Sequence, residues 1–473
     1  LFDASDFVAY PRVSPDGRRI AWIAWNHPDM PWDASTLYVA DRTADGGITG
    51  VRPIAGGAGE SRQSVLEPRW DVDGTLYFVS DRSGWWNLYR LAARRVEPVY
   101  PIEADIAGPL WTLGQSSYAL TGDGRAVVRC THAASDRLAV VTLASAASRP
   151  LDLPFTSFSS VALLAAGTAI AVAASAVAEP AIIAVDLESA AHRILRAPAS
   201  LELDPRYVSI AEPLEYPTAG TLTAHAFFYP PANPEFEAPS GERPPVIVKA
   251  HGGPTSHSCP VFSLATQYWT SRGFAVLDVN YGGSSGFGRA YRERLEGEWG
   301  VVDVHDVVAG VEYLARTGRI DVARAAIRGG SAGGFTVLAA LAFHETFKAG
   351  ANYYGVSDLE ALARDTHKFE SRYLDRLIAP LPDGRALYEA RSPIRHLEGF
   401  SAPLITFQGS EDRVVPPSQS RAIVAALERQ GIAAPYFEFE GEQHGFRKAE
   451  SLVRSLEAEL AFYGRVFGFE PSV

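Results

Sequence analysis

Residues 325–338 of the chain read AAIRGGSAGGFTVL. A short apolar run leads into Gly-x-Ser-x-Gly, formed by Gly329, Ser331 and Gly333, and a helix-forming run follows over 335–343. This order predicts a strand, a sharp turn and a helix, with a serine hydroxyl exposed at the turn. Flanking glycines would let the strand and the helix approach without side-chain clashes. The pattern also arises by chance in glycine-rich loops, so its meaning depends on the rest of the chain.

The composition indicates a globular protein with more than one domain. The chain has 473 residues, 47% of them hydrophobic and 21% charged, and a single core rarely grows beyond about 250–300 residues. The formal net charge of -12 argues against nucleic acid or a membrane as a partner, because both need a basic surface. No Cys/His cluster has zinc-site spacing and no phosphate-binding glycine loop is present, so we expect no metal and no cofactor.

Cysteine usage is low, with only Cys130 and Cys259. This fits a reducing compartment or an aerobic protein that avoids thiols, and a single disulfide between the two stays open. We expect a cytoplasmic protein. No charge lies between Asp152 and Glu179, a length that could span a bilayer. Because that run is rich in Ala, Ser and Thr and is interrupted by Gly167, we interpret it as two buried strands and a turn.

The N-terminal 200 residues contain a repeat. Residues 11–22 read PRVSPDGRRIAW, and residues 68–79 return as PRWDVDGTLYFV. Weaker returns follow at 121–125 and 165–168. A period of about 40–60 residues, each with a strand, a tight turn and further strands, is typical of β-propeller blades. We therefore expect about four blades over 1–200. Four are few for a closed ring, and the chain begins with Leu1 rather than Met, so we expect further blades upstream.

The composition changes near residue 201. Strands and helices alternate from there to the end, which predicts a mostly parallel sheet covered on both faces. We therefore expect an α/β domain over 201–473. Its hairpin is expected at 214–216 and 222–229, its further strands at 246–250, 275–279, 349–353, 404–407 and 436–439, and its helices include 303–316 and 418–430.

Three further motifs accompany Ser331. The first is HGGPT at 251–255, directly after an expected strand. Paired glycines there would let the N–H of Gly253 face the serine, and the N–H of Ala332 would be the second donor of an oxyanion hole. The alternative interpretation of this motif is an ordinary tight turn.

The other two motifs supply a carboxylate and a histidine. Asp412, with Glu411 as a rival, follows the expected strand 404–407, and His444 lies in a glycine-flanked loop after 436–439. The order Ser331, Asp412, His444 is that of α/β-hydrolases. Each residue follows a strand at the end where open α/β sheets place their sites. Together the motifs predict a serine hydrolase with this triad.

On these residues the chain resembles the prolyl oligopeptidase family of serine peptidases, in its acylaminoacyl-peptidase and dipeptidyl-peptidase-like branch. The motifs that carry the resemblance are HGGPT at 251–255, NYGGSSGFG at 280–288, WG at 299–300 with Asp303 and Asp306, GGSAGG at 329–334, DRVVP at 412–416 and HGF at 444–446. A less specific match lies at 14–17 (SPDG) and 80–85 (SDRSGW).

The resemblance implies an α/β-hydrolase domain preceded by a β-propeller that restricts access to short peptides. Family propellers have about seven blades, whereas this chain shows about four. Dipeptidyl members anchor a substrate amine with a pair of glutamates, and no adjacent pair occurs before residue 200. We therefore expect an acylaminoacyl-peptidase or oligopeptidase acting on short peptides, and homo-oligomer formation stays open.

The resemblance also implies a pocket for the residue before the cleaved bond. It places Val356 and Val415 near that pocket, with Tyr353, Tyr354 and Tyr373 as further candidates. The alternative is that these side chains only pack in the core. If they line the pocket, it is apolar, and substrates with a charged residue there should be poor.

Three other functions remain open at this point. A dipeptidyl-peptidase or aminopeptidase of the same family would use the same triad. A carboxylesterase would also use it, but would need no propeller. A propeller binding module fused to an inactive hydrolase fold is disfavoured by the intact Ser331, Asp412 and His444.

Overall fold

The structure is a computed structural model that describes residues 2–59, 62–198 and 203–471. It contains two compact units. Unit 1 holds the described N-terminal residues up to 198 and two short later segments, Cys259–Phe262 and Ser285–Arg292, and unit 2 holds the remaining described residues. The domain boundary expected between residues 200 and 201 lies outside the described residues.

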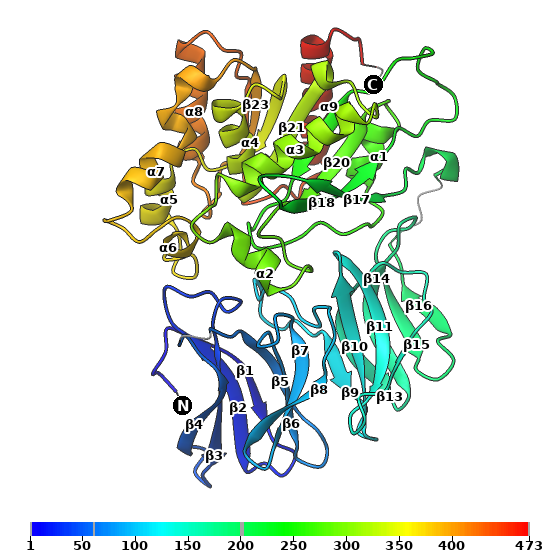
Figure 1. The fold of residues 1–473 in the computed structure, drawn as a ribbon, viewed down its shortest axis with the longest axis vertical. Helices are drawn as coiled ribbons and strands as arrows, with labels where there is room; N and C mark the ends of the chain where they lie inside the picture. The colour runs from blue at the N-terminus through cyan, green and yellow to red at the C-terminus, as the bar shows by residue number, and fades with distance from the viewer. Residues whose placement is uncertain (1, 60–61, 199–202, 472–473) are drawn as a thin grey trace. The chain divides into compact units, whose positions relative to one another are not determined.

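Unit 1 is built from four-stranded antiparallel sheets (Figure 1). The described residues form four of them, in chain order, as expected for propeller blades. The first contains β1 (Phe7–Val13), β2 (Arg19–Trp25), β3 (Thr36–Arg42) and β4 (Ile48–Gly56). The second contains β5 (Val65–Trp70), β6 (Leu76–Ser80), β7 (Asn87–Ala92) and β8 (Arg95–Tyr100). The third contains β9 (Tyr118–Leu120), β10 (Arg125–His132), β11 (Ser135–Thr142) and β12 (Ser148–Pro150), and the fourth β13 (Ser157–Ala165), β14 (Thr168–Ala174), β15 (Ala181–Asp186) and β16 (His192–Arg196).

The repeated Asp-Gly pairs are the turns between the first two strands of a sheet. Gly17 and Gly74 have φ of 73° and 82°, a left-handed conformation that glycine adopts at little cost. The backbone N–H of Gly17 bonds to Ser14 O, and that of Gly74 to Asp71 O, both at 2.9 Å. The repeated Asp-Gly pairs in the sequence therefore correspond to a turn that recurs from sheet to sheet.

The uncharged stretch between Asp152 and Glu179 forms β13, a turn and β14, which confirms two strands in place of a membrane helix. Side chains such as Phe158 and Val161 pack with residues of the third and fourth sheets in one apolar cluster. Among the helices that the structure describes, none is both long and apolar enough to cross a bilayer.

The segment Ser285–Arg292 belongs to unit 1 although it follows a strand of unit 2. It ends in the short helix α2 (Arg289–Arg292). Arg289 and Arg292 each form an ion pair with the fully buried carboxylate of Asp81, at 2.7 Å. A buried charge is stable only when paired, so this double ion pair fixes the segment within unit 1.

Unit 2 contains one eight-stranded sheet. All its neighbouring strands pair in parallel except at the β17–β18 hairpin and between β18 and β20. Across the sheet the order is β17 (Glu212–Pro217), β18 (Thr223–Tyr229), β20 (Ala275–Asn280), β19 (Val246–Ala250), β21 (Ala325–Gly330), β22 (Ala349–Tyr353), β23 (Leu404–Gly409) and β24 (Tyr436–Phe439). With unit 1, this sheet confirms the expected fold class, a β-propeller-like region followed by an α/β-hydrolase sheet.

Helices cover both faces of this sheet (Figure 1). Successive side chains of a strand point to opposite faces. On β21, Arg328 pairs with Glu459 of α9, whereas a Cβ on the next residue, Gly329, would meet Gly333 O of α4. The two helices therefore lie on opposite faces.

The described α-helices of unit 2 are α1 (Leu264–Thr270), α3 (Val302–Arg316), α4 (Ala332–Phe343), α5 (Leu359–Asp365), α6 (Leu374–Leu377), α7 (Arg385–Arg391), α8 (Pro417–Arg429) and α9 (Ala449–Phe467). Its described 3-10 turns are η1 (Pro205–Tyr207), η2 (Glu293–Leu295), η3 (Val322–Arg324), η4 (Pro393–Arg395) and η5 (Leu397–Gly399).

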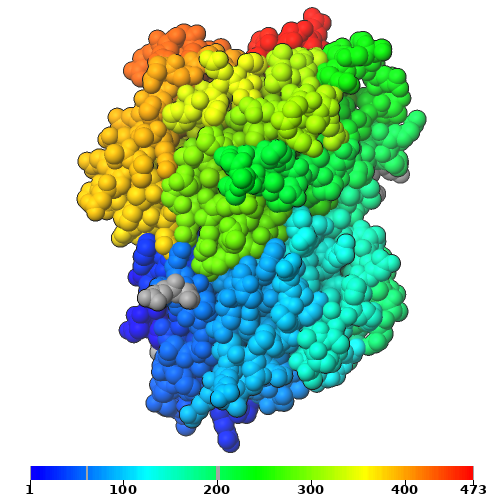
Figure 2. Space-filling view, in the orientation of Figure 1, coloured from blue at the N-terminus to red at the C-terminus, as the bar shows by residue number. Residues whose placement is uncertain are grey.

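The sequence shows directly why α8 is an outer helix. A proline opens it, where the missing N–H costs nothing, and it buries Ile423 and Leu427 on one face. Arg421 and Glu428 on the other face are exposed. In the space-filling view the orange atoms, which include α8, lie at the molecular surface (Figure 2).

The strand register brings the expected site loops together. Ala250, the last residue of β19, pairs with Gly329 of β21. The loop after β19 therefore starts level with the turn that carries Ser331. Further along the same sheet, Gly409 of β23 pairs with Phe439 of β24. The loops that carry Asp412 and His444 therefore begin at the ends of adjacent strands.

Candidate active site

Ser331 lies at the turn between β21 and α4. Its φ is 57° and its ψ is -123°, a conformation that costs a non-glycine residue about 1–3 kcal/mol and persists only where its surroundings hold it. Here the Ser331 N–H donates to Tyr353 O at 3.0 Å, and Phe335 N donates to Ser331 O at 3.1 Å. These bonds tie the strained turn to β22 and to the first turn of α4.

The glycines around Ser331 have no room for a side chain. A Cβ at Gly329 would lie 2.4 Å from Gly333 O, and one at Gly333 would lie 2.1 Å from Ala250 O. Both neighbours are backbone atoms, so they could not move aside as a flexible side chain could. The glycines are thus required by the close approach of α4 to β19 and β21, as the sequence predicted.

Asp412 and His444 are in direct contact. Asp412 Oδ2 lies 2.7 Å from His444 Nδ1. The other oxygen, Oδ1, accepts the N–H groups of Val414 and Val415 at 2.9 and 3.0 Å, and Gln408 donates to Oδ2 at 3.2 Å. The carboxylate is fully buried. These donors fix its orientation, and it in turn orients the imidazole ring.

Glu411, the rival carboxylate, is placed differently. It is exposed, and its backbone N–H donates to Glu442 O at 2.9 Å. Asp412, and not Glu411, therefore contacts His444.

The loop after β19 approaches the serine closely. A Cβ on Gly252 would lie 3.1 Å from Gly330 O and 3.6 Å from Ser331 Cβ. Gly253 has φ of +121°, a value that L side chains rarely adopt. Ala332 is the first residue of α4, where backbone N–H groups have no partner within the helix. The positions of Gly253 and Ala332 thus suit two N–H donors beside Ser331.

The His251 side chain contacts the backbone of this loop and Ser284. Its Nε2 lies 2.7 Å from Ser284 Oγ and its Nδ1 lies 2.9 Å from Gly252 O. The Tyr281 ring stacks on the imidazole, with 4.2 Å between ring centroids. Burial lowers the pKa of His251 to about 4, so the ring is neutral at pH 7. A neutral ring can hold the loop without placing a cation beside the serine.

Beside Ser331 lies a narrow cavity of unit 2, which we call the acyl pocket. Of the five side chains expected there, Val356, Val415 and Tyr373 line it. Gly253 and Ala332 also line it. Its other lining residues are Pro254, Trp299, Leu362, Thr366, Glu370, Leu374, Leu377 and Val414.

Tyr353 and Tyr354 do not line the acyl pocket, which corrects that expectation. The Tyr353 hydroxyl is buried and donates to Glu459 Oε2 at 2.6 Å, on the α9 side of the sheet. Tyr353 pairs with Gly330, two residues after Arg328 on β21, so its side chain points to the same face as Arg328, towards α9. Tyr354 instead packs beside the imidazole of His444, with 4.8 Å between ring centroids.

Thr366 and Glu370 are the polar lining residues that sequence reasoning missed. They follow α5 in a stretch with no strand or glycine motif. No sequence pattern therefore marks Thr366 and Glu370. Their place in the cavity beside Ser331 is visible only in the structure. The pocket is therefore mainly apolar, as expected if these side chains line it, with a polar part formed by Thr366 and Glu370.

Asp303 connects two helices behind the site. It accepts a hydrogen bond from Gly300 N–H and one from the Thr336 hydroxyl of α4, both at 2.6 Å. Its complete burial raises the pKa of this carboxyl to about 6. The bond to Thr336 joins the start of α3 to the helix that follows Ser331.

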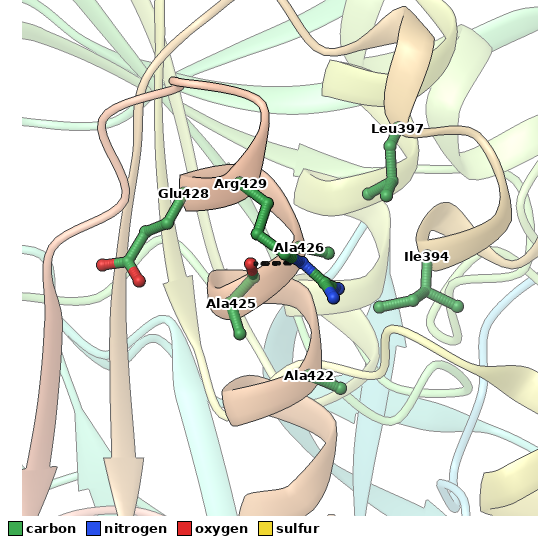
Figure 3. A pocket seen from close by; sticks show the side chains of 7 residues that line it. All are labelled: Ile394, Leu397, Ala422, Ala425, Ala426, Glu428 and Arg429. Atoms are coloured by element: carbon green, nitrogen blue, oxygen red, sulfur yellow. Dashed lines mark hydrogen bonds between the residues drawn. The ribbon is translucent and has the colours of Figure 1, made fainter.

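Another cavity of unit 2 lies between α8 and the turns η4 and η5 (Figure 3). Its lining is mostly Ala and aliphatic, and Arg429 Nε donates to Ala425 O at 3.1 Å within the helix. The lining residues include neither a nucleophile nor a histidine. Among the residues that the structure describes, no cluster of His, Cys, Asp and Glu could hold a metal ion. The acyl pocket, by contrast, is lined by Ser331.

Comparisons with known proteins agree on one family. The family model described as "Prolyl oligopeptidase family" matches residues 260–470. The dipeptidyl peptidase family member 6 of Caenorhabditis elegans is 32% identical over 234 residues, 46% of this chain and 32% of that protein. The acylamino-acid-releasing enzyme 1 of Oryza sativa subsp. japonica is 30% identical over 217 residues, 44% of this chain and 28% of that protein. The matches thus span about a third of these relatives' length.

A solved structure of a puromycin-hydrolysing peptidase from Mycobacterium tuberculosis is similar over the whole chain. It has a TM-score of 0.97 and 43% sequence identity, and the match covers 100% of this chain and 72% of that one. At this identity and coverage the similarity includes both units.

Proposed function

The chain belongs to the prolyl oligopeptidase family of serine peptidases, and from this premise we propose that it hydrolyses amide bonds of short peptides through a Ser331–His444–Asp412 triad. We propose further that it acts as an acylaminoacyl-peptidase or oligopeptidase. The observation that supports the triad best is the 2.7 Å contact between Asp412 and His444, in a domain whose strained serine turn opens into the acyl pocket.

In this proposal Ser331 Oγ attacks the substrate carbonyl. His444 takes the hydroxyl proton and later gives it to the leaving amine, while Asp412 fixes the tautomer and stabilises the imidazolium. The resulting acyl-enzyme is hydrolysed by water. The backbone N–H groups of Gly253 and Ala332 would bind the developing oxyanion, and one such donor is worth about 3–4 kcal/mol.

Two features support a preference for blocked peptides or oligopeptides. The relatives include an acylamino-acid-releasing enzyme. The first 200 residues contain no adjacent pair of glutamates, which dipeptidyl members use as an amine anchor. A carboxylesterase would share the triad, but the four propeller-like sheets favour a peptidase.

A second candidate rests on one observation, the 43% identity to a puromycin-hydrolysing peptidase over the full chain. In that case this protein would release the nucleoside part of puromycin. Chromatography of puromycin incubated with the protein tests this candidate directly.

The triad is tested by covalent labelling with a serine-directed phosphonate. We expect one phosphonate per chain, on Ser331 by mass spectrometry, and no label on Ser331→Ala protein that retains the wild-type circular dichroism spectrum. A wild-type protein that stays unlabelled and inactive on peptides would be a binding module, contrary to the proposal.

A further inference from the structure

We propose that the acyl pocket selects a tyrosine before the cleaved bond, with Thr366 and Glu370 binding the phenol. This inference rests on the proposed function and names its substrate class. It depends on three features of the pocket: an unpaired buried hydroxyl, a mostly buried carboxylate and apolar walls.

The Thr366 hydroxyl is the first feature. Thr366 follows the last residue of α5, and its backbone N–H bonds to Leu362 O at 3.0 Å. Its Oγ1 is buried, yet among the described residues it has no hydrogen-bond partner. A buried hydroxyl without a partner is destabilising, and most such groups in proteins are paired. Because Thr366 lines the acyl pocket, a substrate group could supply this partner.

Glu370 is the second feature. It is the one carboxylate among the described lining residues of the pocket, and about a fifth of its side chain is exposed. His367 lies nearby, with its Nε2 3.5 Å from Glu370 Oε1, and this contact raises the pKa of His367. Glu370 thus has a polar neighbour on one side. Its carboxylate oxygens can also accept a hydrogen bond from a substrate hydroxyl.

The pocket walls are the third feature. Five of its lining side chains are apolar and buried: Leu362, Leu374, Leu377, Trp299 and Val356. The Tyr373 hydroxyl of the wall is already paired with the Thr255 hydroxyl. Apolar walls suit an aromatic ring, and the polar atoms of Thr366 and Glu370 suit a hydroxyl at its tip. A phenylalanine would leave the Thr366 hydroxyl unpaired.

The test compares peptide anilides that differ only in the residue before the cleaved bond: Tyr, Phe or Lys. A site built to bind a hydroxyl rejects the analogue that lacks it, so we expect kcat/KM for Tyr to exceed that for Phe by about tenfold or more. Lys should be poorer than Tyr. A wild-type enzyme that prefers Phe or Lys to Tyr refutes the inference.

Variants then assign the preference to the two residues. Thr366→Val keeps the shape and removes the hydroxyl, and Glu370→Gln removes the charge, so each should reduce the Tyr/Phe ratio, Thr366→Val to near one. Thr366→Ser restores a hydroxyl and should retain the ratio. Thr346→Val and Glu345→Gln, after α4 and outside the pocket, are matched controls that should keep it. An unchanged ratio in both Thr366→Val and Glu370→Gln would contradict the inference.

Phosphonate labelling of the same preparations separates the two levels of the proposal. A protein that is labelled on Ser331 but does not prefer Tyr refutes the tyrosine pocket and leaves the triad standing. A protein without label refutes the active-site assignment, and the inference falls with it.

Discussion

The two neighbouring carboxylates Glu411 and Asp412 differ in environment more than in chemistry. Asp412 is buried under three donors and contacts His444, whereas Glu411 is exposed. Asp412→Asn should therefore lower kcat by about 10⁴-fold, because the amide would orient the wrong tautomer of the histidine. Glu411→Gln should keep near wild-type turnover. Steady-state kinetics of both variants on one anilide provide the check, and the reverse result would exchange the two roles.

His251 should make stability depend on pH. Its folded-state pKa of about 4 lies below the ordinary 6.5, so the unfolded chain binds more protons between these values and stability is lost as pH falls from 6.5 towards 4. The expected loss is on the order of 2 kcal/mol. Asp303 has the opposite sign: its pKa is raised to about 6, so its contribution falls as pH rises from about 4 to 6.

Because these two windows overlap, the wild-type profile alone does not isolate His251. Urea unfolding of wild-type and His251→Gln protein at pH 7 and pH 4.5 isolates the contribution of His251. The difference in unfolding free energy between the two proteins should shrink at the lower pH. A difference that is equal at both pH values would contradict a buried neutral His251.

At the scale of elements, one ion pair joins β21 to α9 directly behind the serine turn. The Arg328 guanidinium pairs with Glu459, which also accepts the hydroxyls of Tyr353 and Tyr463 at 2.6 and 2.8 Å. Glu459 is fully buried and Arg328 nearly so. Glu459→Ala would leave a buried cation unpaired, which costs about 3–5 kcal/mol.

Denaturant unfolding of Glu459→Ala measures this cost. The exposed Glu457 of the same helix supplies the control, Glu457→Ala, whose unfolding midpoint should stay within error of the wild type. Equal midpoints for the two variants would mean that the pair contributes little to the stability of unit 2.

At the scale of the whole molecule, the open question is which end of a peptide the protein accepts. We expect an apolar peptide anilide with an acetyl cap to have a higher kcat/KM than the same anilide with a free amino end, since no glutamate pair precedes residue 200. Ser331→Ala protein serves as the blank. A strong preference for the free amine would indicate an aminopeptidase or dipeptidyl-peptidase, and an acidic anchor would then be sought in unit 1.

The sequence by itself determined the order of the elements and the chemistry of the loops. The repeated Asp-Gly turns indicate the four-stranded sheets, and the glycines around Ser331 indicate the close helix–strand contact, because these backbone geometries tolerate few residue types. Local patterns of this kind are readable since their cause is local. The predicted strand 246–250 coincides with β19, Val246–Ala250.

Only the tertiary structure decided which side chains share a cavity. In the structure the Tyr353 hydroxyl bonds to Glu459 of α9, whereas Tyr373 lines the acyl pocket. Thr366 and Glu370 also line that pocket. The segment Ser285–Arg292 belongs to unit 1, where it pairs with Asp81. These outcomes depend on contacts between residues up to 211 positions apart. No local pattern encodes them, because the direction of a side chain is set by the elements that pack around it.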